Sequence, residues 1–175
     1  MQTFSNPFVW LWRIRHRCGY GVHSPFAFRF ITDVVYERLP FYAYDTLRTL
    51  LPFMHHWRKR MGWELLFRIA NYQQPSVMAI DDREEMAVAY LHAGCRKAKV
   101  TKPSDDEAVE LCYLSRPDDY AVTRMAQGGI LILDNLQRHR AWFRALPATL
   151  FFDLYDLGIA FFDVPYYKQY YVVNF

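Results

Sequence analysis

Two acidic residues directly follow a short apolar run and are the first candidates for binding chemistry. Asp81 and Asp82 come after residues 77–80, a run typical of a strand that is buried on both faces of a sheet. Open α/β sheets bind their ligands beyond the carboxyl ends of their strands, so these carboxylates stand where a ligand would be held. The alternative is structural, with Asp82 capping the helix that follows and Asp81 serving as a solvated turn residue.

A second polar pair follows the clearest buried strand of the chain. Asp134 and Asn135 come directly after residues 130–133. Their position at the end of a strand again predicts a place in a ligand site. The structural alternative is a turn in which the pair hydrogen-bonds the next loop.

Cationic side chains provide the third candidate site. Lys102 follows a weak strand, and together with Arg96 and Arg116 it could form an anion pocket over the sheet. His23 could act as a base, or could be hydrogen-bonded to backbone beside a helix start. The sequence holds no nucleophile elbow, no phosphate-binding loop and no HExxH motif, so no catalytic residue is assigned.

The elements that position these residues alternate between strand and helix after Pro75. Predominantly apolar segments predict strands over 77–80, 109–114, 130–133, 149–153, 159–162 and 170–175, and residues 99–101 form a weak strand. Helices are predicted to begin at Asp82 and at Ser104, and a further helix covers residues 137–146. Another is predicted to begin at Asp118 or Asp119 and to end at Met125, before the break at Gly128-Gly129. Such alternation predicts an α/β protein with a mostly parallel sheet covered on both faces, and an antiparallel hairpin at the end.

The first 74 residues are expected to form a helical cap on this sheet, within a single domain of 175 residues. A hydroxyl cap followed by proline, Ser24-Pro25, predicts a helix that ends near Leu39-Pro40. Asp45 is expected to cap a second helix, bent or interrupted at Pro52, and residues 64–71 continue helical.

Composition limits the classes of partner. A net charge of +3 is too small to indicate nucleic acid. Aromatic residues make up 18% of the chain, so a homodimer or a protein partner bound through exposed aromatic side chains is plausible. No apolar stretch is long enough to span a membrane, and the three dispersed cysteines are typical of a reducing compartment, which predicts a cytoplasmic protein.

The basic, aromatic N-terminal segment allows a further hypothesis. Trp10, Trp12, Arg13, Arg15 and Arg17 could bind an anionic membrane or nucleic acid, and such binding would weaken with salt. The adjacent pair His55-His56 points in two directions on a helix and therefore cannot bind one metal.

Three segments carry a resemblance to a known family. Residues 125–135 (MAQGGILILDN) resemble the helix, glycine turn and fifth strand of class I S-adenosylmethionine-dependent methyltransferases. The hairpin around Asp156-Leu157-Gly158 is similar to the terminal hairpin of small O-methyltransferases, and residues 21–26 (GVHSPF) resemble the lead-in of a bacterial group. The resemblance implies a Rossmann-like methyltransferase fold with S-adenosylmethionine as the ancestral cofactor.

The sequence departs from this family where the cofactor would bind. The family's glycine-rich loop after the first strand is absent, because no glycine occurs between Asp81 and Gly94. Lys102 stands where the family's second strand ends in a ribose-binding acid, and residues 102–108 leave no room for the family's third strand. In metal-dependent members Asp134-Asn135 would be joined by an acid at the position of Ser115, so no bound metal is expected.

These departures predict a methyltransferase-like protein that has lost cofactor binding and catalysis and acts in self-association or partner binding. Positional candidates for a surviving cofactor site are Asp81, Asp82, Lys102, Ser115, Asp134 and Asn135. The alternative is an active methyltransferase with a rebuilt pocket, in which Asp81 or Asp82 holds the cofactor ribose and Asp134 or Asn135 orients an acceptor.

Overall fold

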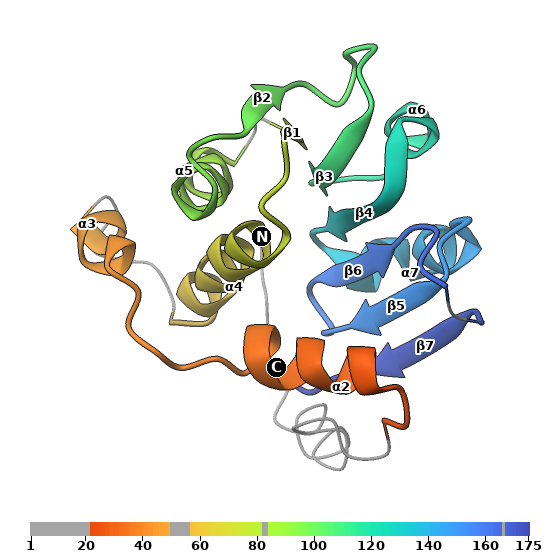
Figure 1. The fold of residues 1–175 in the computed structure, drawn as a ribbon, viewed down its shortest axis with the longest axis horizontal. Coiled ribbons are helices and arrows are strands. Elements are labelled where there is room, and N and C mark those ends of the chain that lie inside the picture. The colour runs from red at the N-terminus through yellow and green to blue at the C-terminus, as the bar shows by residue number, and fades with distance from the viewer. Residues whose placement is uncertain (1–21, 50–56, 82–83, 166) are drawn as a thin grey trace.

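A computed structural model describes residues 22–49, 57–81, 84–165 and 167–175 of the chain. The helices are α2 (Pro25–Phe30), the π-helix η2 (Ile31–Val35), α3 (Ala43–Thr49), α4 (Trp57–Gln73), α5 (Glu85–Gly94), α6 (Asp119–Thr123) and α7 (Leu136–Ala145). The strands are β1 (Val77–Ile80), β2 (Lys99–Thr101), β3 (Val109–Leu114), β4 (Met125–Leu133), β5 (Leu150–Asp153), β6 (Gly158–Phe161) and β7 (Gln169–Val172) (Figure 1).

The seven strands form one mixed sheet in the order β2-β1-β3-β4-β6-β5-β7. β6 runs antiparallel to both of its neighbours, and the other pairs are parallel. This arrangement confirms the predicted α/β fold with a mostly parallel sheet and an antiparallel hairpin. The last strand, β7, pairs parallel with β5, so the antiparallel part of the described sheet is limited to β6.

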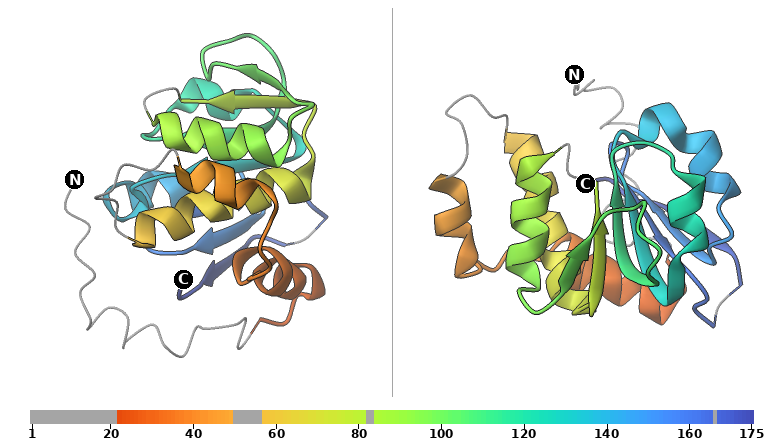
Figure 2. Two further views of the ribbon diagram at one scale, coloured as in Figure 1. Left: turned by 90° about the vertical axis from the view of Figure 1, so that its left-hand side faces the viewer. Right: turned by 90° about the horizontal axis from the view of Figure 1, so that it is seen from above.

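Helices cover both faces of the sheet (Figure 2). The alternation of side chains along β3 shows why, because Leu111 and Tyr113 join the apolar cluster under α4 and α5. Cys112 and Leu114 point to the other face and join the cluster under α6 and α7. Strands that are buried on both faces read as continuous apolar runs, which is the pattern that predicted them.

The N-terminal helices start as expected but end earlier. The Ser24 hydroxyl accepts from the Ala27 N–H at 3.3 Å, and Pro25 occupies the first turn. The helix then widens into η2 and stops at Val35, not near Leu39-Pro40. The buried Arg68 guanidinium explains this end, because it donates to the carbonyls of Val34 (2.7 Å) and Val35 (3.1 Å).

Several other predicted boundaries were wrong. α3 begins at Ala43, so Asp45 lies inside its first turn and does not cap it. The residue before α5 is Glu84, whose side chain makes no capping bond, which corrects the capping role expected of Asp82. Ser104 starts no helix, because residues 103–107 form turns and bends.

The glycine pair lies within a strand and does not break a helix. α6 already ends at Thr123, and β4 begins at Met125. Gly128 has φ +72° and lies where the register of β3 and β4 shifts, so its lack of a side chain permits the irregular backbone. The expected helix end at Met125 was therefore wrong.

Some predictions concern residues outside the described part of the chain. These are the ligand role of Asp82, the bend at Pro52, the pair His55-His56, Cys18, and the basic aromatic segment with Trp10, Trp12, Arg13, Arg15 and Arg17. They stay predictions. The described residues include no helix long and apolar enough to cross a membrane.

The face of the sheet that α4 and α5 cover buries one hydroxyl group for which no hydrogen-bond partner is found in the described residues. Tyr90 of α5 is fully buried, and no hydrogen bond from its hydroxyl is found. Burial, with a smaller contribution from Glu64, raises its pKa from 10.0 to about 12.

We therefore expect Tyr90→Phe to raise the free energy of unfolding by about 1 kcal/mol at pH 7, because it removes an unsatisfied buried polar group. The folded-state pKa is the higher one, so the stability linked to neutral Tyr90 is present below about pH 10 and is lost as the pH rises towards 12. Urea unfolding at pH 7 and pH 11 measures both effects. Lower stability of the variant at pH 7 would contradict the prediction.

Candidate functional site

The predicted site residues lie at the carboxyl end of the parallel strands, as expected. Asp81 follows β1, Lys102 follows β2, Ser115 follows β3, and Asp134-Asn135 follow β4. The structure separates them into residues that line a cavity and residues that support the surrounding loops.

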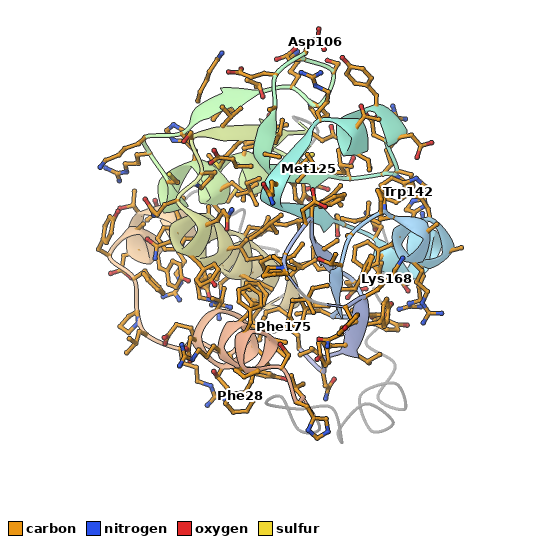
Figure 3. The ribbon with its side chains drawn as sticks, turned by 45° about the vertical axis from the view of Figure 1, so that its right-hand side comes forward. Phe28, Asp106, Met125, Trp142, Lys168 and Phe175 are labelled. Carbon is orange, nitrogen blue, oxygen red and sulfur yellow. The ribbon has the colours of Figure 1, made fainter. Side chains whose placement is uncertain are left out.

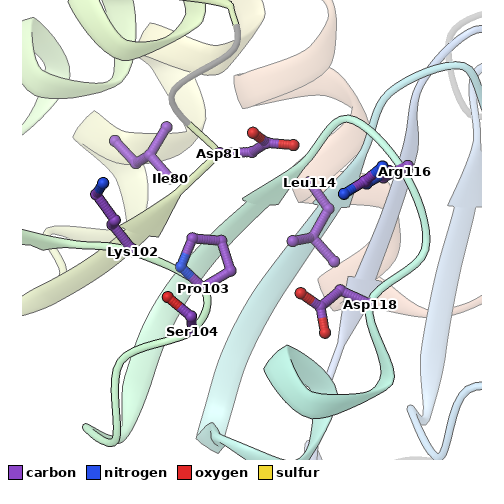
Figure 4. A pocket seen from close by; sticks show the side chains of 8 residues that line it. All are labelled: Ile80, Asp81, Lys102, Pro103, Ser104, Leu114, Arg116 and Asp118. Atoms are coloured by element: carbon purple, nitrogen blue, oxygen red, sulfur yellow. The ribbon is translucent and has the colours of Figure 1, made fainter.

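A cavity of about 190 Å³ lies beyond the ends of β1 and β3 (Figure 4). Its lining comes from the last residues of β1 and β3 and from the segments after β1, β2 and β3, and consists of Ile80, Asp81, Lys102, Pro103, Ser104, Leu114, Arg116 and Asp118. Two of the predicted residues, Asp81 and Lys102, are among them. The side chains of Ser104 and Asp118 were expected as helix caps, and their place in a cavity was missed.

Asp81 is held by the neighbouring strand end. Its N–H donates to the Tyr113 carbonyl at 3.0 Å, which extends the parallel pairing of β1 and β3 by one step. The Ser115 hydroxyl donates to the Asp81 carboxylate. Ser115 thus acts on the cavity through Asp81 and does not line it.

Asp134 and Asn135 form a turn at the start of α7. The Asp134 N–H donates to the Leu114 carbonyl at 2.9 Å. The Asp134 carboxylate accepts from the Asn135 N–H (2.8 Å) and from Asn135 Nδ2 (3.1 Å), and Asn135 adopts a left-handed φ of 54°. These contacts agree with the turn interpretation, and neither residue lines the cavity.

Of the three basic residues expected to form an anion pocket, the structure brings only two together. Lys102 and Arg116 line the cavity. Arg96 does not, and its guanidinium lies 5.9 Å from the ring centre of Tyr42. The reason is that Arg96 belongs to the turn before β2, whereas Lys102 and Arg116 follow the carboxyl ends of β2 and β3.

Asp118 combines the cavity with a helix start. Its Oδ1 accepts from the N–H groups of Tyr120 (3.0 Å) and Ala121 (3.2 Å), so it caps α6. Its place four residues after the end of β3 was the available sequence signal for a second role, because residues in such loops face the end of the sheet.

Acidic side chains at this edge of the sheet influence titratable groups on both faces of β3. Burial raises the pKa of the Tyr113 hydroxyl, and Asp134, Glu84 and Asp81 raise it further. On the other face burial raises the pKa of the Cys112 thiol to about 12, with help from Asp118 and Asp81. Lys102 and Arg116 are the cavity's balancing cations.

No group of three or more His, Cys, Asp or Glu side chains in the described ranges is arranged to hold a metal ion. Asp134 and Asn135 supply oxygen atoms, but Ser115 and Arg116 follow the neighbouring strand. A hydroxyl and a guanidinium are poor companions for a hard cation, which prefers carboxylate and carbonyl oxygens.

Sequence comparison identifies no relative, since no family model and no curated protein matches the chain. Solved structures with a similar arrangement include methyltransferases. The O-methyltransferase TomG from Streptomyces achromogenes, in complex with SAM, has a TM-score of 0.40 and 12% identity over 63% of this chain and 74% of its own. The SAH-bound methyltransferase PaMTH1 of Podospora anserina has a TM-score of 0.40 and 12% identity over 80% and 74% of the chains. A putative O-methyltransferase from Klebsiella pneumoniae has a TM-score of 0.37 and 10% identity over 66% and 74%.

The topology of the chain itself identifies the fold. β1 lies between β2 and β3, β4 follows, and the antiparallel strand β6 separates β4 from β5. Residues 102–108 lead from β2 to β3 without an intervening strand. The chain therefore has a Rossmann-like α/β fold.

Proposed function

We propose that this methyltransferase-like protein no longer binds S-adenosylmethionine or transfers methyl groups, and that it functions by association with a second copy of itself. The observation that carries the loss of the cofactor is the direct connection 102–108. Its residues Pro103 and Ser104 line the space beyond β1 and β3 and leave a cavity of about 190 Å³. Pockets that enclose ligands of drug size measure about 300–1,000 Å³, and the smaller volume here supports the loss of the nucleoside cofactor.

The side chains in this space also oppose the cofactor. The family's glycines let backbone N–H groups approach the ligand, whereas residues 81–93 of this chain contain no glycine. A carboxylate of the cofactor about 4 Å from Asp81 would be repelled by about 1 kcal/mol in water and by about 4 kcal/mol at an effective dielectric constant of 20. Micromolar affinity corresponds to only about 8 kcal/mol, so this repulsion and the missing backbone contacts would remove most of it.

Support for self-association comes from large apolar and aromatic side chains that are exposed on the N-terminal helices and on the segment between them. Tyr42 is 75% exposed and Leu39 is 67% exposed, both in the segment between η2 and α3. Phe28 on α2 and Tyr72 on α4 are each 46% exposed, and Phe28 lies on the outer side of its helix (Figure 3). Exposed aromatic side chains are the type enriched at protein interfaces.

The cofactor proposal is tested by isothermal titration of the folded protein with S-adenosylmethionine and S-adenosylhomocysteine, with and without magnesium. We expect no saturable heat at ligand concentrations up to about 100 μM. Circular dichroism before and after the titration establishes that the protein is folded. Saturable binding at one site would overturn the proposal and favour an active enzyme with a rebuilt pocket, for which methyl transfer would be lost in Asp134→Ala.

Self-association is tested by sedimentation velocity over a range of protein concentrations. We expect a dimer whose dissociation constant rises at least about tenfold in the double variant Tyr42→Ser, Tyr72→Ser, because these side chains would be buried between the copies. Tyr120→Ser is the matched control, since Tyr120 is also 46% exposed but lies on α6 on the other face of the sheet. A monomer at about 100 μM, or equal effects of both variants, would contradict the proposed interface.

A further inference from the structure

We propose that the cavity beyond β1 and β3 binds a free α-amino acid through its ammonium and carboxylate groups. This goes beyond the proposed function and does not depend on it, because the cavity exists whether or not the protein dimerises.

The position of the cavity is the first support. The chain leaves β1 towards β2 on one side and then returns to place β3 on the other side of β1. The chain thus continues from β1 to β2 on one side of this strand pair and from β3 to β4 on the other, and such switch points are where open α/β sheets hold ligands. Asp81 and Arg116, which follow β1 and β3, face the same space (Figure 4).

The charges of the lining favour a ligand that carries both a positive and a negative group. Two carboxylates, Asp81 and Asp118, and two cations, Lys102 and Arg116, bring the formal charge of the lining to zero. A simple anion would meet both carboxylates, and a simple cation would meet both basic groups. A zwitterion offers one group to each, and it has no net charge to be repelled.

Two of these side chains retain unused bonding capacity. Arg116 makes no hydrogen bond or ion pair with another residue in the described part of the chain, although Asp118 is only two residues away. Both hydrogen bonds that Asp118 accepts use its Oδ1. A carboxylate has about four acceptor positions, so Asp118 can cap α6 and still bind an ammonium group. Arg116 can bind a carboxylate with two parallel hydrogen bonds.

The size and the apolar part of the lining limit the ligand further. The cavity has a volume of about 190 Å³. That space accommodates an amino acid of small or medium size. Ile80, Pro103 and Leu114 offer apolar contacts to its side chain, and the Ser104 hydroxyl adds a polar group.

The experiment is a ligand-detected NMR screen of the proteinogenic L-amino acids, each at about 1 mM, followed by calorimetric titration of those that bind. We expect at least one dissociation constant below about 1 mM. The N-acetyl derivative lacks the ammonium group and the α-amide lacks the carboxylate, and each should bind at least about tenfold more weakly. Absence of binding by all the amino acids, or equal binding of either derivative, would overturn the proposal.

Variants locate the site. Arg116→Gln and Asp118→Asn should each weaken binding about tenfold or more, and asparagine keeps the cap of α6, so the fold is retained. Arg96→Gln is the matched control, because Arg96 is an exposed loop arginine that packs against Tyr42 outside the cavity. Equal affinity of Arg116→Gln and the wild type would also overturn the proposal. Binding of S-adenosylmethionine that persists in both variants would refute the proposed function alone.

Discussion

Asp153→Ala is expected to lower the free energy of unfolding by about 3 kcal/mol, because it removes one partner of a largely buried ion pair. Asp153, at the end of β5, is 3% exposed. Its carboxylate accepts from Arg140 Nε at 2.8 Å and from the Tyr170 hydroxyl at 2.7 Å, which connects β5 to α7 and β7. Without the carboxylate, the Arg140 guanidinium would be left against the protein without its counter-charge.

The same carboxylate supports the turn that follows β5. It accepts from the Tyr155 N–H at 2.9 Å, and Tyr155 has a left-handed φ of 78°. A non-glycine residue adopts this conformation at some energetic expense, so the hydrogen bond helps to hold the hairpin between β5 and β6. Loss of this bond adds to the expected destabilisation.

Urea unfolding followed by circular dichroism measures this effect. Asp153→Asn should lose less stability than Asp153→Ala, since the amide oxygen can still accept from Tyr170 or Tyr155. Asp45→Ala is the control, because the Asp45 side chain is 97% exposed and its pair with Arg48 is 3.9 Å long. That variant should stay within about 0.5 kcal/mol of the wild type. A loss of less than about 1 kcal/mol in Asp153→Ala would contradict the role given to the buried carboxylate.

Gly94→Ala is expected to lower the free energy of unfolding by about 3 kcal/mol, the upper part of the range for overpacking. A Cβ atom at Gly94 would lie 2.4 Å from the Phe67 carbonyl oxygen and 2.8 Å from the Ala70 Cβ. Both atoms belong to α4, and a backbone carbonyl within a helix cannot turn aside as a long side chain can. Helices α4 and α5 would have to separate, which would open the core on that face of the sheet.

Gly62→Ala, a substitution within α4, is expected to have the opposite effect and to raise the free energy of unfolding. A Cβ atom at Gly62 of α4 would make an ordinary contact of 3.7 Å with Leu157 Cδ1. Alanine also has the better helix propensity, so stability should rise by about 0.5–1 kcal/mol. Thermal and urea unfolding of the two variants should therefore move in opposite directions. Equal stability of Gly94→Ala and the wild type would show that α4 and α5 adjust freely.

The sequence by itself determined the strands and several helix starts, because the signals for these elements are local. Strands β1 and β3 are short apolar runs, as expected of strands buried on two faces. Ser24 and Asp118 cap their helices through backbone N–H groups two or three residues away, so a few letters of sequence predict them. The alternation of elements then predicted the mostly parallel sheet.

Helix ends and the glycine pair were decided by contacts between distant residues. η2 stops where Arg68, thirty-three residues beyond Val35, takes the last carbonyls, and nothing near Leu39-Pro40 signals that partner. Gly128 lies in β4 because β3 pairs with both ends of that strand, at Met125 and at residues 130–133, across a shift of register. Pairing between strands is a property of the sheet, and the local pattern of two glycines favoured a break instead.

The candidate site was predictable as an edge of the sheet but not as a cavity. Asp81 and Asp134 each follow an apolar run and Lys102 follows a weak strand, so their place at the carboxyl end needed only the parallel topology. Which of them share a space depends on the strand order, which brings the loop after β2 against the ends of β1 and β3. The same order excludes Arg96 and includes Asp118, because three-dimensional neighbours are set by the packing of the sheet and not by distance along the chain.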